Sequence, residues 1–165
     1  MDNKENKLRV GIVTSSCLLR TGFSTNAKAL IPYLWKSKKF DIYHLNQGLG
    51  DTPDFQRFPW KNEGVYRSGT FDQNRMNSSD EAYKRIVSYG NLAIESFIIR
   101  NKIEALLLVE DGWSFCSDQY YKSKWWPYLK DNVFLWTTID SLPPIPLYRE
   151  WAENEPSLDN NTRSA

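Results

Sequence analysis

Four short runs of the chain are apolar over most of their length and have the pattern of β-strands. Stretches with helical spacing or loop composition separate them. Strands of this kind bury both faces, which is typical of a parallel sheet with helices on both sides. The sequence therefore predicts an α/β fold with parallel strands near Arg9 to Thr14, Phe40 to Leu45, Ala105 to Glu110 and Val133 to Thr138.

A helix is predicted after the first strand. It is expected to run from Ser24 or Thr25 to Lys36, and either hydroxyl is expected to cap the free amides of its first turn. Pro32 counts against a straight helix here, because an interior proline removes one helical hydrogen bond.

The strongest helical pattern begins at Ser78. Ser78 and Glu81 have the spacing of a capping box, and apolar residues follow at steps of three or four. This pattern predicts one helix of about 20 residues that packs on a single face. The preceding segment, Asn46 to Asn77, is rich in Gly, Pro, Asn, Asp and aromatic residues without a sustained period, which predicts a long loop with short extended pieces.

Length and charge limit the organisation of the chain and its partners. With 165 residues and 41% hydrophobic content, the chain can bury one ordinary core. The expected division is a polar tail over 1–8, one domain over 9–151 and a polar, disordered tail over 152–165. A net charge of +1 provides no global field that would attract nucleic acid or an anionic membrane. No signal segment or membrane span is recognisable, so a cytoplasmic location is expected.

Few cysteines and histidines leave little room for metal or nucleophilic chemistry. Cys17 and Cys116 are isolated, which argues against a zinc site, and His44 is expected to have a structural or surface role rather than to serve a catalytic triad. Neither GxGxxG nor a P-loop occurs, so no dinucleotide cofactor is predicted. No Asp-x-Asp is present to hold a divalent ion against a diphosphate, so no metal site is predicted.

Polar residues that follow the predicted strands are the candidates for a binding site, because ligands of parallel sheets lie beyond the carboxyl ends of the strands. The turn after the first strand leads into a helix N-terminus, where free amides and the positive dipole end suit an anion or a sugar hydroxyl. Gly22 in this turn would let a ligand or a neighbouring backbone approach closely. The alternative is a simple turn glycine followed by a capping hydroxyl.

Three segments together resemble the N-terminal half of glycosyltransferases of the GT-B fold, particularly the family 4 type met in phages and large viruses. The segments are RVGIVTSS with the TGFST that follows, ALLLVEDGW, and VFLWTTIDSLPPIPLYREW. The resemblance covers about Arg9 to Trp151 and implies a Rossmann-like domain on the acceptor side of a cleft. A sugar would be transferred in that cleft from a nucleotide-sugar donor to a carbohydrate or glycan acceptor.

The resemblance also assigns seven residues to the cleft. They are Gly22, Ser24, Thr25, Asp111, Trp113, Asp140 and Ser141. The first three would lie near the transferred sugar or the diphosphate, the next two would face the acceptor, and the last two would form the cleft floor.

The family's nucleotide-binding second domain has no counterpart after Trp151. The chain is therefore expected to be incomplete for catalysis alone, either as a truncated product or as one half that acts with a partner chain. A nonenzymatic α/β domain that binds a carbohydrate or a protein is the alternative function. Asp111 and Asp140 also have a structural alternative, in which the first ends its strand through a turn and the second caps the loop before two prolines.

Overall fold

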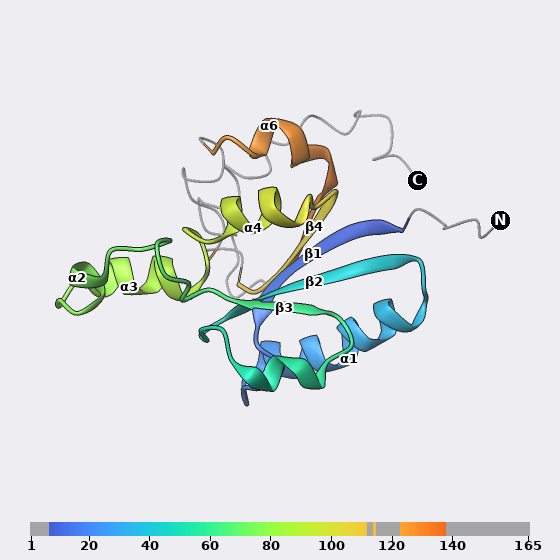
Figure 1. The fold of residues 1–165 in the computed structure, drawn as a ribbon, viewed down its shortest axis with the longest axis horizontal. Coiled ribbons are helices and arrows are strands. Elements are labelled where there is room, and N and C mark those ends of the chain that lie inside the picture. The colour runs from blue at the N-terminus through green and yellow to red at the C-terminus, as the bar shows by residue number, and fades with distance from the viewer. Residues whose placement is uncertain (1–6, 112–113, 115–122, 138–165) are drawn as a thin grey trace, which may run out of the picture.

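A five-stranded, all-parallel sheet forms the centre of the computed structural model, which describes residues 7–111, 114 and 123–137 (Figure 1). The strand order is β3-β2-β1-β4-β5. The strands are β1 Leu8–Ser15, β2 Phe40–Gln47, β3 Lys61–Gly64, β4 Ala105–Val109 and β5 Val133–Trp136. The predicted α/β class and the parallel pairing of the four predicted strands are confirmed.

The fifth strand, β3, lies in the segment predicted to be a long loop. Its sequence, KNEG, is polar, and it pairs only with β2, at the edge of the sheet. Edge strands often carry polar or charged residues, and the first three residues of β3 are not buried, so no apolar run is required. The same segment also contains a short 3-10 helix, η1 Pro53–Arg57, and one turn of helix, α2 Gln73–Met76.

The first helix, α1, spans Gly22–Lys36 and starts earlier than predicted. Thr21 is its N-cap, and its side chain accepts a hydrogen bond from the Ser24 amide at 3.0 Å. The prediction that Ser24 or Thr25 caps this helix is therefore wrong, since both residues are already helical. Pro32 lies inside α1 without ending it.

The predicted long helix is divided into two helices, α3 Glu81–Ser88 and α4 Ile94–Asn101. Gly90 lies between them with φ +81°, a left-handed conformation that ends a helix and that favours glycine. The predicted capping box is also wrong, because Asp80 is the N-cap of α3 and accepts from the amide of Tyr83 at 3.0 Å. Periodicity alone missed the break, because the apolar spacing continues on both sides of Gly90.

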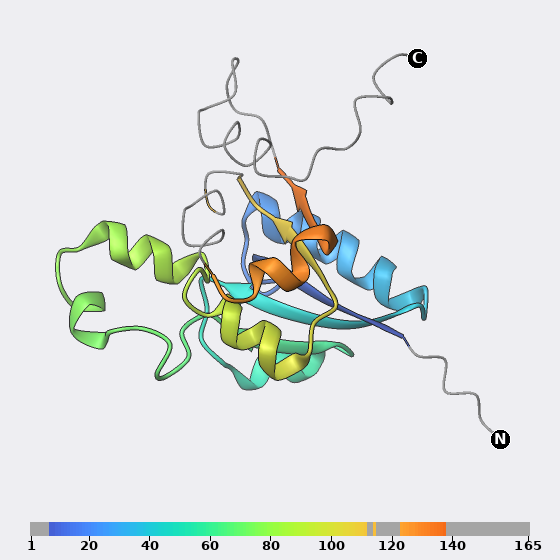
Figure 2. The same cartoon turned by 90° about the horizontal axis from the view of Figure 1, so that it is seen from above.

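Helices cover both faces of the sheet (Figures 1 and 2). On one face, Ile12 of β1 packs in a cluster with Ala27 and Ile31 of α1. On the other face, Val13 packs in a cluster with Phe97 of α4 and with residues of α6, Trp126–Leu129. Neighbouring residues of a strand point to opposite faces, so this alternation explains why the predicted strands are apolar throughout. Among the described residues, no helix has the length and apolar character that a membrane crossing requires.

Candidate ligand site at the carboxyl edge of the sheet

Three polar side chains form a row across the carboxyl ends of β2, β1 and β4. Ser15 pairs with Gln47 in the sheet register, and the preceding residue, Thr14, pairs with Val109. This register places Glu110, the residue after β4, beside Ser15. The chain runs outward from β1 to β3 and then crosses to β4 on the other side of β1, so Ser15 and Glu110 lie at the point where the strand order reverses. Open α/β sheets bind their ligands at this point.

The floor under this row is apolar. Two positions earlier on the same three strands lie Leu45, Val13 and Leu108, each at most 1% exposed and each part of the α4-side cluster. Polar groups at the edge therefore lie directly on a dry core, which lowers the local dielectric and strengthens their hydrogen bonds.

Glu110 is the central group of the row. It is 5% exposed, and its Oε1 accepts a hydrogen bond from Ser15 Oγ at 2.8 Å. Burial raises the pKa of Glu110, the neighbouring negative charge of Asp111 raises it further, and the bond from Ser15 opposes both effects. Within the described part of the chain, no lysine or arginine forms an ion pair with this carboxylate. Hydrogen bonds from the backbones of Asp111 and Ser15 also stabilise this carboxylate. Glu110 is therefore a nearly buried acceptor that no cation of the described residues neutralises.

Gln47 supplies a second acceptor. Its Nε2 donates to the carbonyl of Tyr89 at 2.9 Å, which fixes the orientation of the amide. Its Oε1 is buried and has no hydrogen-bond partner among the described residues. Leaving a buried acceptor unpaired costs about 1 to 3 kcal/mol, so a ligand hydroxyl that donates to this oxygen would recover that free energy.

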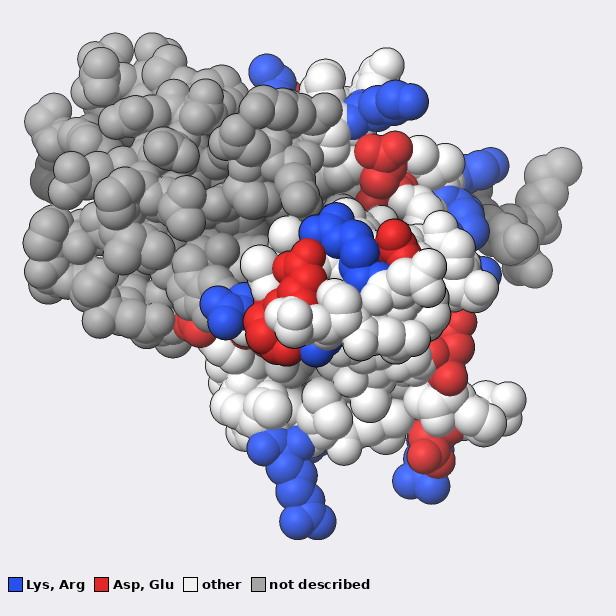
Figure 3. All heavy atoms as spheres, turned by 90° about the vertical axis from the view of Figure 1, so that its left-hand side faces the viewer, with Lys and Arg blue, Asp and Glu red and all other residues white. Residues whose placement is uncertain are grey.

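Helix α3 forms the opposite wall of a cavity of about 330 Å³ that the row lines. Lys84 and Arg85 bring positive charge to this wall. Lys84 Nζ forms an ion pair with Glu81 at 2.7 Å. Arg85 is exposed and forms no ion pair with the described residues. Burial and the nearby charge of Glu110 raise the pKa of Tyr89, which also lines the cavity. Figure 3 looks onto this side of the molecule, where basic and acidic side chains are interspersed rather than gathered into a patch of one sign.

The three residues predicted near the first turn, Gly22, Ser24 and Thr25, do not line the cavity. Gly22 is exposed at the first position of α1, and no atom lies within 4 Å of the place where a Cβ would stand. Ser24 Oγ donates to the carbonyl of Leu19 at 2.7 Å, and Thr25 Oγ1 donates to that of Thr21 at 3.2 Å. These hydroxyls hold the turn in shape, and of these five residues only Leu19 lines the cavity.

Of the remaining predicted residues, Asp111 directly follows Glu110 and is half-buried beside the cavity. Trp113, Asp140 and Ser141 lie outside the described residues. No group of three or more His, Cys, Asp or Glu side chains in the described ranges could hold a metal ion.

Sequence reasoning missed Glu110, Gln47 and the two cations of α3. Glu110 was treated as the end of a strand, although alternation from Leu108 places it on the same face as the cavity. Nothing in the sequence around Gln47 indicates a binding role, because its position beside Ser15 follows only from the strand register. Lys84 and Arg85 have the pattern of an ordinary solvated helix face.

The chain matches no model of a known protein family, and no curated protein is significantly similar to it. The site must therefore be interpreted from its own chemistry.

Proposed function

We propose that the carboxyl-edge cavity binds the sugar, with its adjoining phosphate, of a nucleotide sugar, and that the chain is the acceptor-side half of a glycosyltransferase-like protein. One observation carries this proposal: two nearly buried acceptors, Glu110 and Gln47, face a cavity at the strand-order reversal, opposite the cations of α3. Sugar hydroxyls donate well to such acceptors, and a phosphate suits Lys84 and Arg85.

The division of charge supports a ligand with two chemically different ends. The acceptors Glu110 and Gln47 lie on the sheet, whereas α3 contributes Lys84, its partner Glu81, and Arg85, which has no ion-pair partner among the described residues. A free phosphate would meet the Glu110 carboxylate, which repels it, whereas a free neutral sugar would leave Arg85 without a counter-charge, since Glu81 already pairs with Lys84. A sugar phosphate satisfies both walls.

The size of the cavity supports partial rather than complete donor binding. Ligand pockets span about 300 to 1,000 Å³, and this cavity of about 330 Å³ is near the lower end of that range. It accommodates a monosaccharide-sized group and leaves the base of a nucleotide sugar to a second domain. The chain alone is therefore expected to bind a nucleotide sugar weakly and to transfer nothing.

The test is an NMR titration of the full chain with a panel of nucleotide sugars, and with the matching nucleotides and free sugars as controls. We expect sugar-dependent shifts at Glu110 and Gln47 for at least one donor. Glu110→Gln should weaken binding at least tenfold, because a charge-assisted hydrogen bond is lost. Glu104→Gln is the matched control, since this exposed carboxylate precedes the opposite end of β4.

Three results would count against the proposal. If no donor in the panel perturbs the cavity, or if Glu110→Gln binds as the parent does, the assigned site is wrong. If a donor binds but no transfer or hydrolysis follows when a second domain is supplied, the chain is a carbohydrate-binding domain rather than half of an enzyme.

A further inference from the structure

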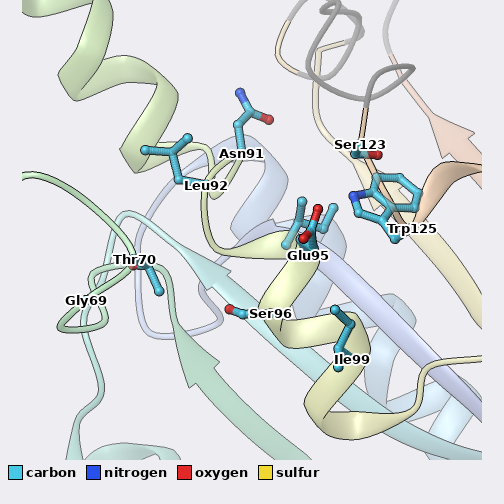
Figure 4. Close-up of a pocket in the computed structure, with 10 residues that line it drawn as sticks. Gly69, Thr70, Asn91, Leu92, Glu95, Ser96, Ile99, Ser123 and Trp125 are labelled. Atoms are coloured by element: carbon cyan, nitrogen blue, oxygen red, sulfur yellow. The ribbon is translucent and has the colours of Figure 1, made fainter.

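A second cavity, of about 570 Å³, lies on the outer side of α4 (Figure 4). Asn91 and Leu92, from the connection between α3 and α4, line it at one end. Glu95 and Ile99 come from α4 itself, and the indole of Trp125 lies to one side of them in Figure 4. Tyr89, two residues before Asn91, lines the carboxyl-edge cavity, so the two cavities are neighbours along this connection.

Two hydroxyl oxygens of this cavity are available only as acceptors. Ser96 Oγ donates its proton to the carbonyl of Ala93 at 3.0 Å, and Thr70 Oγ1 donates to that of Arg67 at 2.7 Å. Each hydroxyl oxygen keeps lone pairs but has no further proton to offer. A ligand must therefore supply the donors for these two oxygens.

Glu95 adds the negative charge of the site. It lies in the first turn of α4, where the helix dipole favours a carboxylate. It forms no ion pair with any lysine or arginine that the structure describes. The described residues that line the cavity include no lysine or arginine at all, in contrast to the carboxyl-edge cavity.

Apolar groups complete the lining. Ile99 is 63% exposed, an unusual exposure for isoleucine, whereas Trp125 lines the cavity although it is almost completely buried. A carboxylate beside an exposed aliphatic side chain suits a cation whose charge is carried on an organic body, because the body can pack on Ile99 while the charge pairs with Glu95.

We infer that this second cavity binds a protonated amine carried on a small hydroxylated body, such as an amino sugar. The ammonium group pairs with Glu95, and the remaining donors of the ligand reach Ser96 and Thr70. An anionic ligand is disfavoured by the absence of a described cation in the lining. This inference does not rest on the proposed function, since a different cavity and a different charge carry it.

The test compares two probes that share one ring, D-glucosamine in its protonated form and D-glucose. Each is titrated into the full isotope-labelled chain and followed by NMR. We expect glucosamine to shift the resonances of Glu95, Ser96 and the Trp125 indole, and glucose to bind at least tenfold more weakly. Glu95→Gln keeps the shape of the side chain, removes its charge and should weaken glucosamine binding at least tenfold.

Glu81→Gln is the matched control, because Glu81 is an exposed glutamate of α3 that lines the other cavity. It should leave glucosamine binding unchanged. Equal binding of glucose and glucosamine would overturn the assignment of an amine. Glucosamine binding that survives in Glu95→Gln, or the lack of any shift at the cavity, would overturn the site itself. If no nucleotide sugar binds at the carboxyl-edge cavity, the expected results of the glucosamine experiment stay the same, so the two proposals are tested separately.

Discussion

The stability of the fold should depend on the protonation of His44. This histidine is completely buried in β2 on the α1 side of the sheet, and the Thr14 backbone and the Asn62 side chain offset only part of the cost of burying its charged form. Burial lowers the pKa of His44 from 6.5 to about 4. Below pH 6.5 the unfolded chain takes up a proton that the folded chain excludes, so the free energy of unfolding should fall as the pH falls. Above pH 6.5 the imidazole is neutral in both states and adds no pH dependence.

The size of the effect follows from the two pKa values. Each pKa unit corresponds to about 1.4 kcal/mol, so His44 should lower the free energy of unfolding by about 2 kcal/mol at pH 5 and by about 3 kcal/mol below pH 4. The total free energy of unfolding of a small domain is about 5 to 15 kcal/mol. A loss of this size is therefore easily measured by urea denaturation at pH 7.5 and pH 5. His44 is the only histidine of the chain.

His44→Leu and His44→Gln provide the comparison, because neither side chain titrates. Carboxyl groups titrate in the parent and in the variants alike, so the difference between their pH profiles isolates His44. Each variant should lose about 2 kcal/mol less than the parent between pH 7.5 and pH 5. Parallel profiles in parent and variants would refute the reasoning, as would an NMR titration that gives His44 an ordinary pKa in the folded chain.

Four further substitutions test the fold and the site. Gly64→Ala should lower the free energy of unfolding by about 3 kcal/mol or more, because a Cβ would lie 2.2 Å from the carbonyl carbon of Gly50. Gly22→Ala, where a Cβ has open space, should change it by less than about 0.5 kcal/mol. Equal denaturation midpoints for the two variants would contradict this prediction. Thr21→Ala removes the cap of α1 and should cost about 1 kcal/mol, which a retained midpoint would exclude. Glu110→Gln should raise the melting temperature at pH 7, because the substitution removes a buried charge. The difference from the parent should vanish at low pH, where Glu110 is protonated. A lower melting temperature of the variant at pH 7 would show that burial is not the cause of the raised pKa of Glu110.

Strand positions were predictable here because the central strands are buried on both faces. Apolar runs such as ALLLV have few other places in a folded domain. The polar edge strand β3 was not predictable, since its stability comes from pairing with β2 rather than from its own composition. The division of the predicted helix into α3 and α4 was predictable from Gly90, because a glycine within a helical pattern signals a possible end of the helix.

The candidate site was predictable only in its location. Polar residues after the strands pointed to the carboxyl edge, and the structure places a cavity there. The decisive groups depend on register and alternation, which decide that Glu110 rather than Asp111 lies beside Ser15. Gln47 is defined by its contact with the Tyr89 carbonyl, 42 positions away in the sequence. Such contacts cannot be derived from local spacing.

The break at Gly90 separates α4, which packs on the sheet, from the two helices that precede it. These helices, α2 and α3, project from the sheet as an arm (Figure 1), in which Arg75 forms an ion pair with Asp80 at 2.7 Å. The arm is tied to the end of β2 where Gly48 donates its amide proton to the Ser88 carbonyl at 3.2 Å. The acceptors of the carboxyl-edge cavity belong to the sheet, while the cations belong to the arm. If the proposed site is occupied as we suggest, replacement of the arm would exchange one anionic group of a ligand for another without disturbing the core, so that a change of specificity would require little compensating change in the strands.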